Sequence, residues 1–394
     1  MISRRLVLAA LVSLLPAYAA AQSIELGERL TVRSDTLGEE RVIFVRTPRQ
    51  YATATERYPV LYLTDGEAQF AHTAATVEFL ARNARMPEMI VVAIGNTDRT
   101  RDLTPTKATL TRPDGRPMEF PTAGGADKFL TFIATELKPF IEKGYRTAPF
   151  SVFAGHSFGG LFTMHALTTR PDTFNAYIAV SPTLTWDNDM PVKRTADLLR
   201  DRRELPKTLV VTMGDEPVFD GALATLRKTL SGTTPAGFEW EIQRFDDEDH
   251  GSVVMRSHYI GLRKVFSLWR LPVDSTGTFQ GSFGNFEKHY AALSERMGYT
   301  ITPPEGTVNN VGYGALQSGR LDEAIRYFEL NVRNYPESAN VYDSLGEGLE
   351  AAGKLEVARD RYAEAVKRGE ATKDPLLDAF KQHLEAIGKK LKSS

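Results

Sequence analysis

The chain has 394 residues, a formal net charge of -2 and no cysteine. Its length predicts two or three domains, and its balanced charge removes the electrostatic basis for binding nucleic acid. The lack of cysteine excludes disulfides, cysteine-ligated zinc, iron–sulfur centres and a thiol nucleophile. We therefore expect a globular protein that binds no nucleic acid, needs no metal or other cofactor, and uses a nucleophile other than cysteine if its catalysis is covalent.

The N-terminus has the three parts of a secretory signal peptide. Arg4 and Arg5 precede an apolar run over residues 6–15, and residues 17–21 offer two sites of the A-x-A type. This run is too short to span a bilayer. The pattern predicts a signal peptide at residues 1–21 and a mature protein in the periplasm or outside the cell. An uncleaved N-terminal anchor is the alternative.

Between Leu30 and Leu271, short β-rich runs alternate with helical patterns such as residues 129–141. Several of the runs are continuously apolar, which is typical of strands buried on both faces of a mainly parallel sheet. The expected strands are residues 42–46, 58–63, 89–94, 150–153, 176–180, 208–213 and 238–245. The sequence therefore predicts an α/β domain over residues 22–272.

The chain beyond residue 284 is helical and contains an internal repeat. Residues 319–324 recur as residues 353–358, a spacing of 34 residues, which is the tetratricopeptide period. Glycines at matching positions, Gly312 and Gly346, predict close approach of paired helices.

Aromatic residues at the next matching positions, Phe328 and Tyr362, are expected to fill the space between those helices. We predict a linker and leading helix at residues 273–300 and two tetratricopeptide repeats at 301–394, with capping helices at 285–297 and 374–389. Two repeats cannot bury a continuous core alone, so they are expected to pack on the first domain or on a second subunit. A coincidental helical hairpin is the alternative.

The segment Gly155-His156-Ser157-Phe158-Gly159 has the pattern G-x-S-x-G. An apolar strand at residues 149–154 leads into it and a helix starting near Gly159 leads out, as the strand–turn–helix of a nucleophile elbow requires. The flanking glycines leave room for a strained turn at the serine. This context predicts that Ser157 is a catalytic nucleophile, whereas the alternative is a glycine-rich turn with an incidental serine.

A serine nucleophile needs a base, and the base needs an acid to orient it. In strand–turn–helix hydrolases these residues follow in the order Ser, Asp or Glu, His. His250, in the polar loop after the last expected strand, is the predicted base, and His258 is the weaker candidate. Glu216 is the first choice of acid. The alternatives are Asp215 and Asp220 in the same acidic loop.

The oxyanion hole requires two backbone N–H groups. One is expected from Phe158, which follows the nucleophile. The other is expected from Glu67, because Asp65-Gly66 makes a tight turn directly after an expected strand. A plain turn is the alternative reading of Asp-Gly.

These residues resemble the esterase D-like α/β-hydrolases, in the branch that includes periplasmic siderophore esterases. The likeness covers about residues 37–271, through residues 37–41, 58–66, 98–102, 155–161, 181–182 and 249–251. The resemblance implies an α/β-hydrolase fold, hydrolysis of carboxylic esters, and catalytic roles for Ser157 and His250. Where relatives often have Ser-Pro-Ser-x-Trp-Trp, this chain has Ser-Pro-Thr-Leu-Thr-Trp at residues 181–186, which predicts a different substrate wall.

Three further residues are candidates for substrate contacts. One of Arg99 and Arg101 is expected to bind an anionic or catecholate substrate. The alternative is that Arg99 pairs with Asp98 or Asp102 and fixes its own loop. Trp186 is either a substrate platform or a cover for the core.

Taken together, the sequence predicts a secreted serine esterase that cleaves a small-molecule ester through an acyl-enzyme on Ser157. The repeats are expected to bind a protein partner or to mediate self-association, and no stable membrane span is expected. One alternative is a non-catalytic binding protein with a vestigial hydrolase domain. The other is a serine peptidase or acyltransferase on the same fold.

Overall fold

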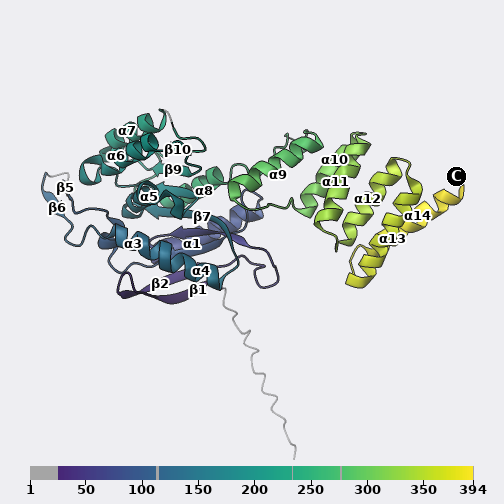
Figure 1. The fold of residues 1–394 in the computed structure, drawn as a ribbon, viewed down its shortest axis with the longest axis horizontal. Coiled ribbons are helices and arrows are strands. Elements are labelled where there is room, and N and C mark those ends of the chain that lie inside the picture. The colour runs from purple at the N-terminus through teal and green to yellow at the C-terminus, as the bar shows by residue number, and fades with distance from the viewer. Residues whose placement is uncertain (1–24, 112–114, 233, 276, 394) are drawn as a thin grey trace, which may run out of the picture.

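The computed structural model describes residues 25–111, 115–232, 234–275 and 277–393. The predicted signal peptide at residues 1–21 lies outside the described residues. The chain forms a sheet-containing lobe and an all-helical lobe that extends away from it (Figure 1). The predicted boundary near residue 272 falls between α8 (Val253–Val265) and α9 (Phe283–Met297).

The first lobe contains an eight-stranded sheet with the order β1-β2-β4-β3-β7-β8-β9-β10. Its strands are β1 (Glu28–Ser34), β2 (Glu39–Arg46), β3 (Tyr58–Leu63), β4 (Ile90–Ile94), β7 (Thr147–His156), β8 (Ala176–Val180), β9 (Thr208–Met213) and β10 (Glu239–Arg244). The β1–β2 and β2–β4 pairs are antiparallel, whereas the other pairs are parallel. The sheet is therefore mixed but mostly parallel, like that of an α/β-hydrolase.

All seven expected strands are present, and the structure adds elements that the sequence analysis missed. The edge strand β1 buries only Val32 and Ser34, so it lacks the apolar run that marked the others. A separate hairpin pairs β5 (Thr109–Thr111) with β6 (Pro117–Glu119). Short, polar or edge strands leave little hydrophobic signal, which explains both omissions.

Helices cover both faces of the sheet (Figure 1). Alternate residues of β7 point to opposite faces: Val152 belongs to the core under α1 (Gly66–Arg82) and α8, and Phe153 to the core on the other face. The helices on that other face are α3 (Ala126–Phe132), α4 (Lys138–Gly144), α5 (Phe158–Thr169), α6 (Trp186–Asp201) and α7 (Asp220–Leu230). The expected helix over residues 129–141 runs from α3 into α4 through a π-helical turn at Ile133–Leu137.

The second lobe is built from helix pairs. Its helices are α10 (Glu305–Gln317), α11 (Leu321–Asn334), α12 (Ala339–Ala351), α13 (Leu355–Thr372) and α14 (Leu377–Ser393). The first helices of the two pairs, α10 and α12, begin 34 residues apart, as do the second helices, α11 and α13. A Cβ at Gly312 would lie 2.6 Å from the Phe328 ring, and one at Gly346 would lie 2.6 Å from the Tyr362 ring. The predicted close approach of the paired helices at these glycines is therefore confirmed.

The leading helix α9 joins the two lobes. Phe283 and Phe286 of α9 are buried in the same core cluster as Leu271 of the first lobe. Arg296 donates to Glu239 Oε1 at 2.5 Å and to Thr208 Oγ1 at 2.6 Å, at the start of β10 and β9. As expected, the first helix after the boundary packs on the sheet-containing lobe.

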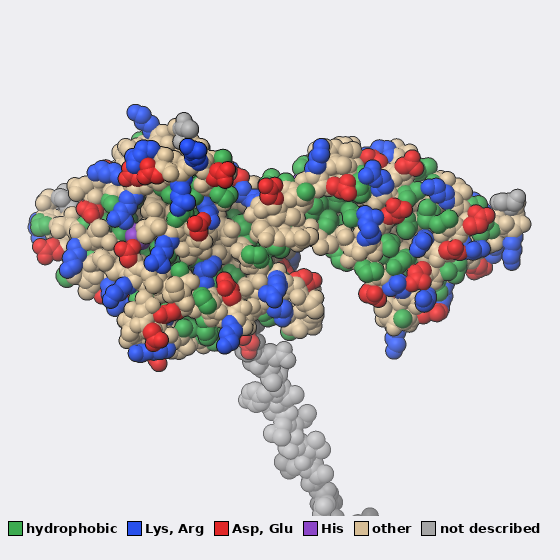
Figure 2. Space-filling view, in the orientation of Figure 1, with side chains coloured by type: hydrophobic (Ala, Val, Ile, Leu, Met, Phe, Trp, Pro, Cys, Tyr) green, Lys and Arg blue, Asp and Glu red, His purple; other side chains and the backbone are tan. Residues whose placement is uncertain are grey.

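Hydrophobic side chains also gather on the helical lobe near this junction (Figure 2). A cavity of about 490 Å³ at this junction is lined by Tyr290, Tyr313, Trp269 and Leu271, among other residues. Across the described parts of the chain, every helix is too short or too polar to cross a membrane.

Candidate active site

Ser157 occupies the sharp turn between β7 and α5. Its backbone has φ 61° and ψ −117°, a conformation that is strained for a residue with a Cβ and that clusters at functional sites. The Ser157 N–H donates to the Val180 carbonyl oxygen at 2.9 Å, which anchors the turn to the end of β8. The predicted strand–turn–helix is therefore present.

Three glycines allow this turn to pack closely. A Cβ at Gly155 would lie 2.2 Å from the Gly159 carbonyl oxygen, and one at Gly159 would lie 2.3 Å from Thr64 Oγ1. A Cβ at Gly160 would lie 2.8 Å from the Val180 carbonyl oxygen. Each distance is shorter than a real Cβ contact, so larger residues would displace the elbow from β3 and β8.

The sheet register brings the loops after four strands together. His156, at the end of β7, pairs with Val180 at the end of β8, and Val180 pairs with Thr212 near the end of β9. Met213 in turn pairs with Arg244 at the end of β10. The loops that carry Ser157, Ser181, Glu216 and His250 therefore leave the same edge of the sheet, where parallel α/β sheets bind their ligands.

Glu216 and His250 are in direct contact. Glu216 Oε2 lies 2.5 Å from His250 Nδ1. The other carboxylate oxygen, Oε1, accepts hydrogen bonds from Ser181 Oγ at 2.6 Å and from the Gly214 N–H at 3.2 Å. Although burial opposes ionisation of Glu216, the hydrogen bonds from His250 and Ser181 hold its pKa below the usual value. Glu216 is thus an ionised carboxylate whose two oxygens are both hydrogen-bonded and which contacts the imidazole of His250.

The alternative acids and the alternative base lie elsewhere. Asp215 and Asp220 both pair with Arg244 on the surface. His258 is buried between α1 and α8, where its Nδ1 lies 2.9 Å from Thr73 Oγ1. Burial lowers the pKa of His258 to about 3. Of the predicted candidates, only Glu216 and His250 form a pair at the site.

His156, which was not among the predicted site residues, contacts the loop that carries His250. Its Nε2 lies 2.6 Å from the His250 carbonyl oxygen, and the two rings are 4.6 Å apart. Since a carbonyl oxygen only accepts, Nε2 of His156 carries the proton. Burial and the neighbouring His250 lower the pKa of His156 to about 4, which keeps its ring neutral. The feature of the sequence that could have indicated this role is the position of His156 directly before the nucleophile in the G-x-S-x-G motif.

His156 holds the loop of His250 against the elbow. Among the described residues, Ser157 and His250 are not joined by a direct hydrogen bond. In hydrolases without substrate this bond is often long and shortens only in the substrate complex.

The two expected oxyanion donors lie in the first turns of two helices. Phe158 is the first residue of α5 and Glu67 is the second residue of α1. N–H groups in the first turn have no partner within their helix, and the helix dipole favours negative charge there. The contact between Gly159 and Thr64 places these two helix starts next to each other.

Arg99 braces the elbow and does not pair with Asp98 or Asp102, the partners we expected. Its guanidinium donates to Asp65 Oδ1 at 2.6 Å and Oδ2 at 3.2 Å, and to the His156 carbonyl oxygen at 3.0 Å. Asp65 has a left-handed backbone, with φ 56°, directly before α1. Arg99 therefore ties the expected oxyanion loop to the nucleophile turn through its Nε and Nη2 groups.

Arg101 and Trp186 are also committed to internal contacts. Arg101 donates to both oxygens of Glu39 and to Asp102, and these contacts fix its loop. Trp186 is fully buried and donates from Nε1 to Thr106 Oγ1 at 3.1 Å. The burial of Trp186 favours its interpretation as a cover for the core.

A cleft of about 1040 Å³ is lined by segments that follow β8 and β9 and by the β5–β6 region, and its lining does not include Ser157, Glu216 or His250. Thr183 and Thr185 form part of its wall after β8, and Val218 and Phe219 form part after β9. The β5–β6 hairpin and Phe120 contribute the opposite wall, and the Phe120 ring packs 5.4 Å from that of Phe158. A cleft this large reaches the upper end of the range for small-molecule sites.

Residues 34–250, more than half of the chain, match the family model described as "Putative esterase". The chain belongs to this esterase family. It is a hydrolase homologous to siderophore esterases. The matched residues include strands β2 to β10, the elbow and His250.

Two siderophore esterases and one serine hydrolase of known structure are similar to this chain. Ferri-bacillibactin esterase BesA of Bacillus subtilis is 32% identical over 218 residues, which cover 50% of this chain and 75% of BesA. The siderophore enterobactin esterase of Emericella nidulans is 42% identical over 146 residues, covering 32% of this chain and 47% of that protein. The structure of an IroE-like serine hydrolase from Shewanella oneidensis has 30% identity and a TM-score of 0.67, covering 78% of this chain and 99% of that one.

Proposed function

We propose that this esterase cleaves carboxylic esters through an acyl-enzyme on Ser157, with His250 as the general base and Glu216 as the residue that orients it. The observation that carries this proposal is the 2.5 Å contact between Glu216 and His250 Nδ1, beside a strained serine turn. A carboxylate on Nδ1 leaves Nε2 free to take the proton from the serine hydroxyl. A non-catalytic binding protein would not need this arrangement. Neither would a serine that lies in a glycine-rich turn by chance.

The proposed reaction has two halves. Ser157 Oγ attacks the ester carbonyl carbon while His250 Nε2 removes the hydroxyl proton, and the Phe158 and Glu67 N–H groups stabilise the oxyanion. His250 then protonates the leaving alcohol as the acyl-enzyme forms. Water attacks the acyl-enzyme with His250 again as base, releasing the acid and restoring the serine. Ionised Glu216 stabilises the imidazolium in both halves.

We further propose a siderophore lactone or a similarly large ester as the substrate. Two observations support this: the names of the relatives, BesA and the enterobactin esterase, and the 1040 Å³ cleft, which is lined by Thr183 two residues after Ser181 and by Val218 two residues after Glu216. The Thr183 and Thr185 side of that cleft is the wall whose sequence differs from Ser-Pro-Ser-x-Trp-Trp. The preference of this chain among siderophore lactones is therefore expected to differ from that of the compact siderophore esterases.

A substrate panel tests this function. The purified chain would be assayed on matched short-acyl, feruloyl and siderophore lactone esters, together with an amide analogue and a competing alcohol. The proposal predicts the highest kcat/KM on the siderophore lactone and no turnover of the amide. Equal rates on ester and amide would indicate a peptidase, and transfer to the alcohol would indicate an acyltransferase.

For the remainder of the chain, we propose two tetratricopeptide repeats over residues 301–394 and export through a signal peptide at residues 1–21. The 34-residue offset between the helix pairs supports the repeats, and the basic, apolar and A-x-A segments support export. N-terminal sequencing of the exported protein tests the second proposal. Cleavage near Gln22 is expected, whereas an intact N-terminus would indicate an anchor.

A further inference from the structure

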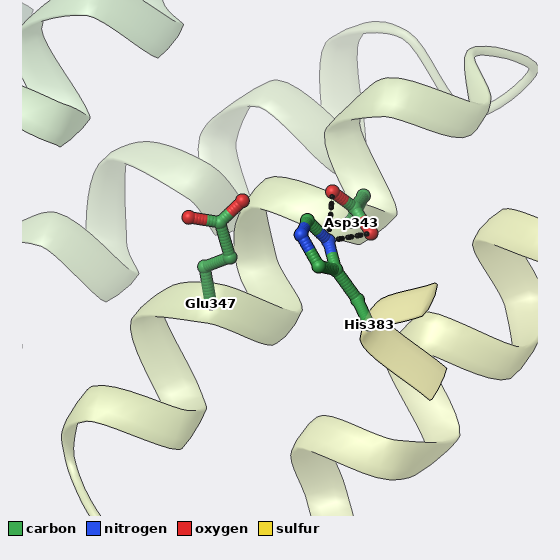
Figure 3. Close-up of side chains that lie close together, drawn as sticks. All are labelled: Asp343, Glu347 and His383. Atoms are coloured by element: carbon green, nitrogen blue, oxygen red, sulfur yellow. Dashed lines mark hydrogen bonds and ion pairs between the residues drawn. The ribbon is translucent and has the colours of Figure 1, made fainter. Parts of the chain in front are cut away.

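A second cluster of chemically active side chains lies in the helical lobe, away from the catalytic loops. Asp343 and Glu347 are four residues apart on α12, so they share one face of that helix. His383 reaches toward them from α14 (Figure 3). One ligand atom from each side chain can be chosen so that all three lie within 4.8 Å of one another.

The contacts within this cluster are short. His383 Nδ1 lies 3.0 Å from both carboxylate oxygens of Asp343. Figure 3 shows the imidazole between the two carboxylates, with Glu347 on its other side. Two ligands at about 2.0–2.2 Å from a tetrahedral zinc ion lie roughly 3.3–3.6 Å apart, so small side-chain rotations would accommodate a metal ion here.

The cluster brings two carboxylates and one imidazole together. Asp343 is 5% exposed, and its carboxylate pairs with the imidazole of His383. A cation that takes one oxygen from each carboxylate and one imidazole nitrogen would offset the negative charge of the two carboxylates.

Neighbouring side chains hold two of these groups in place. The Tyr313 hydroxyl lies 3.1 Å from Glu347 Oε1 and 3.1 Å from Ser344 Oγ. The Tyr362 ring packs 5.5 Å from that of His383. Such supporting contacts are typical of metal sites, where they orient the ligands.

We propose that Asp343, Glu347 and His383 form a binding site for a divalent transition-metal ion, with Zn²⁺ as the ion it fits best. One imidazole nitrogen and two carboxylate oxygens supply three ligands, and water completes a tetrahedron. The imidazole favours zinc over Ca²⁺ and Mg²⁺, which prefer oxygen ligands alone. The expectation from sequence that no metal is needed is revised by this proposal.

The bound ion would connect α14 to α12. Since two of its ligands come from one helix and the third from another, metal binding stabilises the docked position of the last helix. The site lies in the other lobe from Ser157, so it is structural and independent of the proposed ester hydrolysis.

Titration of the full chain with Zn²⁺ tests the proposal. After removal of metals with a chelator, calorimetry would be run on the wild type and on Asp343→Asn, Glu347→Gln and His383→Gln. Matched controls are Glu385→Gln on the surface of α14 and His289→Gln on α9. The chain has no cysteine, so thiolates cannot compete for the ion.

One zinc ion per chain is expected, with the dissociation constant raised by at least about tenfold in the three site variants and unchanged in the two controls. Glu347→Gln keeps the bond between Asp343 and His383, so its loss of affinity would not reflect an undocked helix. Equal affinity in the wild type and His383→Gln, or no stoichiometric binding by a wild type that circular dichroism shows to be folded, would overturn the proposal. Titration with Ca²⁺ is expected to show no binding at this site, and Ca²⁺ binding as tight as that of Zn²⁺ would also overturn it.

Discussion

Glu216 Oε2 lies 2.5 Å from His250 Nδ1. Two nearby carboxylates, Asp215 directly before Glu216 and Asp220 at the start of α7, turn outward to Arg244 on β10. The chain after β9 thus separates a buried carboxylate that faces the imidazole from two surface carboxylates that share a guanidinium.

We expect Glu216→Gln to lower kcat by about a hundredfold to ten-thousandfold with little change in KM. The neutral amide cannot stabilise the imidazolium, and it can hold the imidazole in the wrong tautomer. Steady-state kinetics on a small activated ester measure this. Asp215→Asn is the matched control and should stay within about threefold of wild type, since exposed ion pairs contribute little. Greater damage from Asp215→Asn than from Glu216→Gln would refute this assignment of the acid.

Two buried histidines predict a loss of stability in acid. The pKa values of His156 and His258 are lowered to about 4 and about 3, mainly by burial. Below about pH 6.5 the unfolded chain binds protons at these positions that the folded chain does not, so the free energy of unfolding falls as the pH falls. Each imidazole contributes up to about 1.4 kcal/mol per pH unit until its folded pKa is reached.

His258→Gln isolates one of these contributions, because glutamine can still hydrogen-bond to Thr73 but does not titrate. Urea unfolding between pH 7 and pH 4 should show a shallower pH dependence for the variant than for the wild type. Parallel curves for the two proteins would contradict the assignment of a neutral, buried His258.

The glycines of the elbow predict a steric effect that depends on position. Gly160→Ala would place a Cβ 2.8 Å from the Val180 carbonyl oxygen and should cost about 1–3 kcal/mol of folding free energy. Gly221→Ala in α7 meets nothing within 4 Å and should be neutral or stabilise by up to about 1 kcal/mol. Denaturant unfolding of both variants provides the comparison, and similar effects of the two changes would contradict the packing argument.

Much of the fold could be predicted because the parallel strands are continuously apolar. The bounds of β8 and β9 coincide with the apolar runs at residues 176–180 and 208–213, and both strands are buried throughout. The elbow could be predicted because its glycines and serine lie next to one another in the sequence. The 34-residue repeat likewise needs only comparison of the sequence with itself.

Other features depend on contacts between distant residues, which one sequence does not reveal. Arg99 could pair with several nearby acids, and the fold selects Asp65, 34 residues away. Asp343 and His383 are 40 residues apart and meet only because α14 folds back onto the repeat. The buried position of Trp186 depends on the β5–β6 region and Phe120, whose ring lies 5.3 Å away.

Removal of the helical lobe should lower the thermal stability of the chain but leave most of its activity on a small ester. A chain that ends at residue 272 loses α9, and with it Phe286 from the shared core and the bond from Arg296 to Glu239. We expect it to keep most of its activity on a small soluble ester but to unfold at lower temperature than a chain ending at residue 300, which keeps α9. Thermal unfolding and kcat measurements provide the comparison. Full loss of small-ester activity in a folded chain ending at residue 272 would mean that the helices help to form the active site.

Covalent labelling of Ser157 tests the central claim most directly. A fluorophosphonate probe reacts with a serine that an adjacent base activates, so intact-mass analysis should show one adduct per chain and peptide mapping should place it on Ser157. Ser157→Ala should retain its fold by circular dichroism, lose the adduct, and lower kcat by several orders of magnitude. An adduct on another residue, or ester hydrolysis by Ser157→Ala at the wild-type rate, would contradict the proposal that this chain is a serine esterase acting through Ser157.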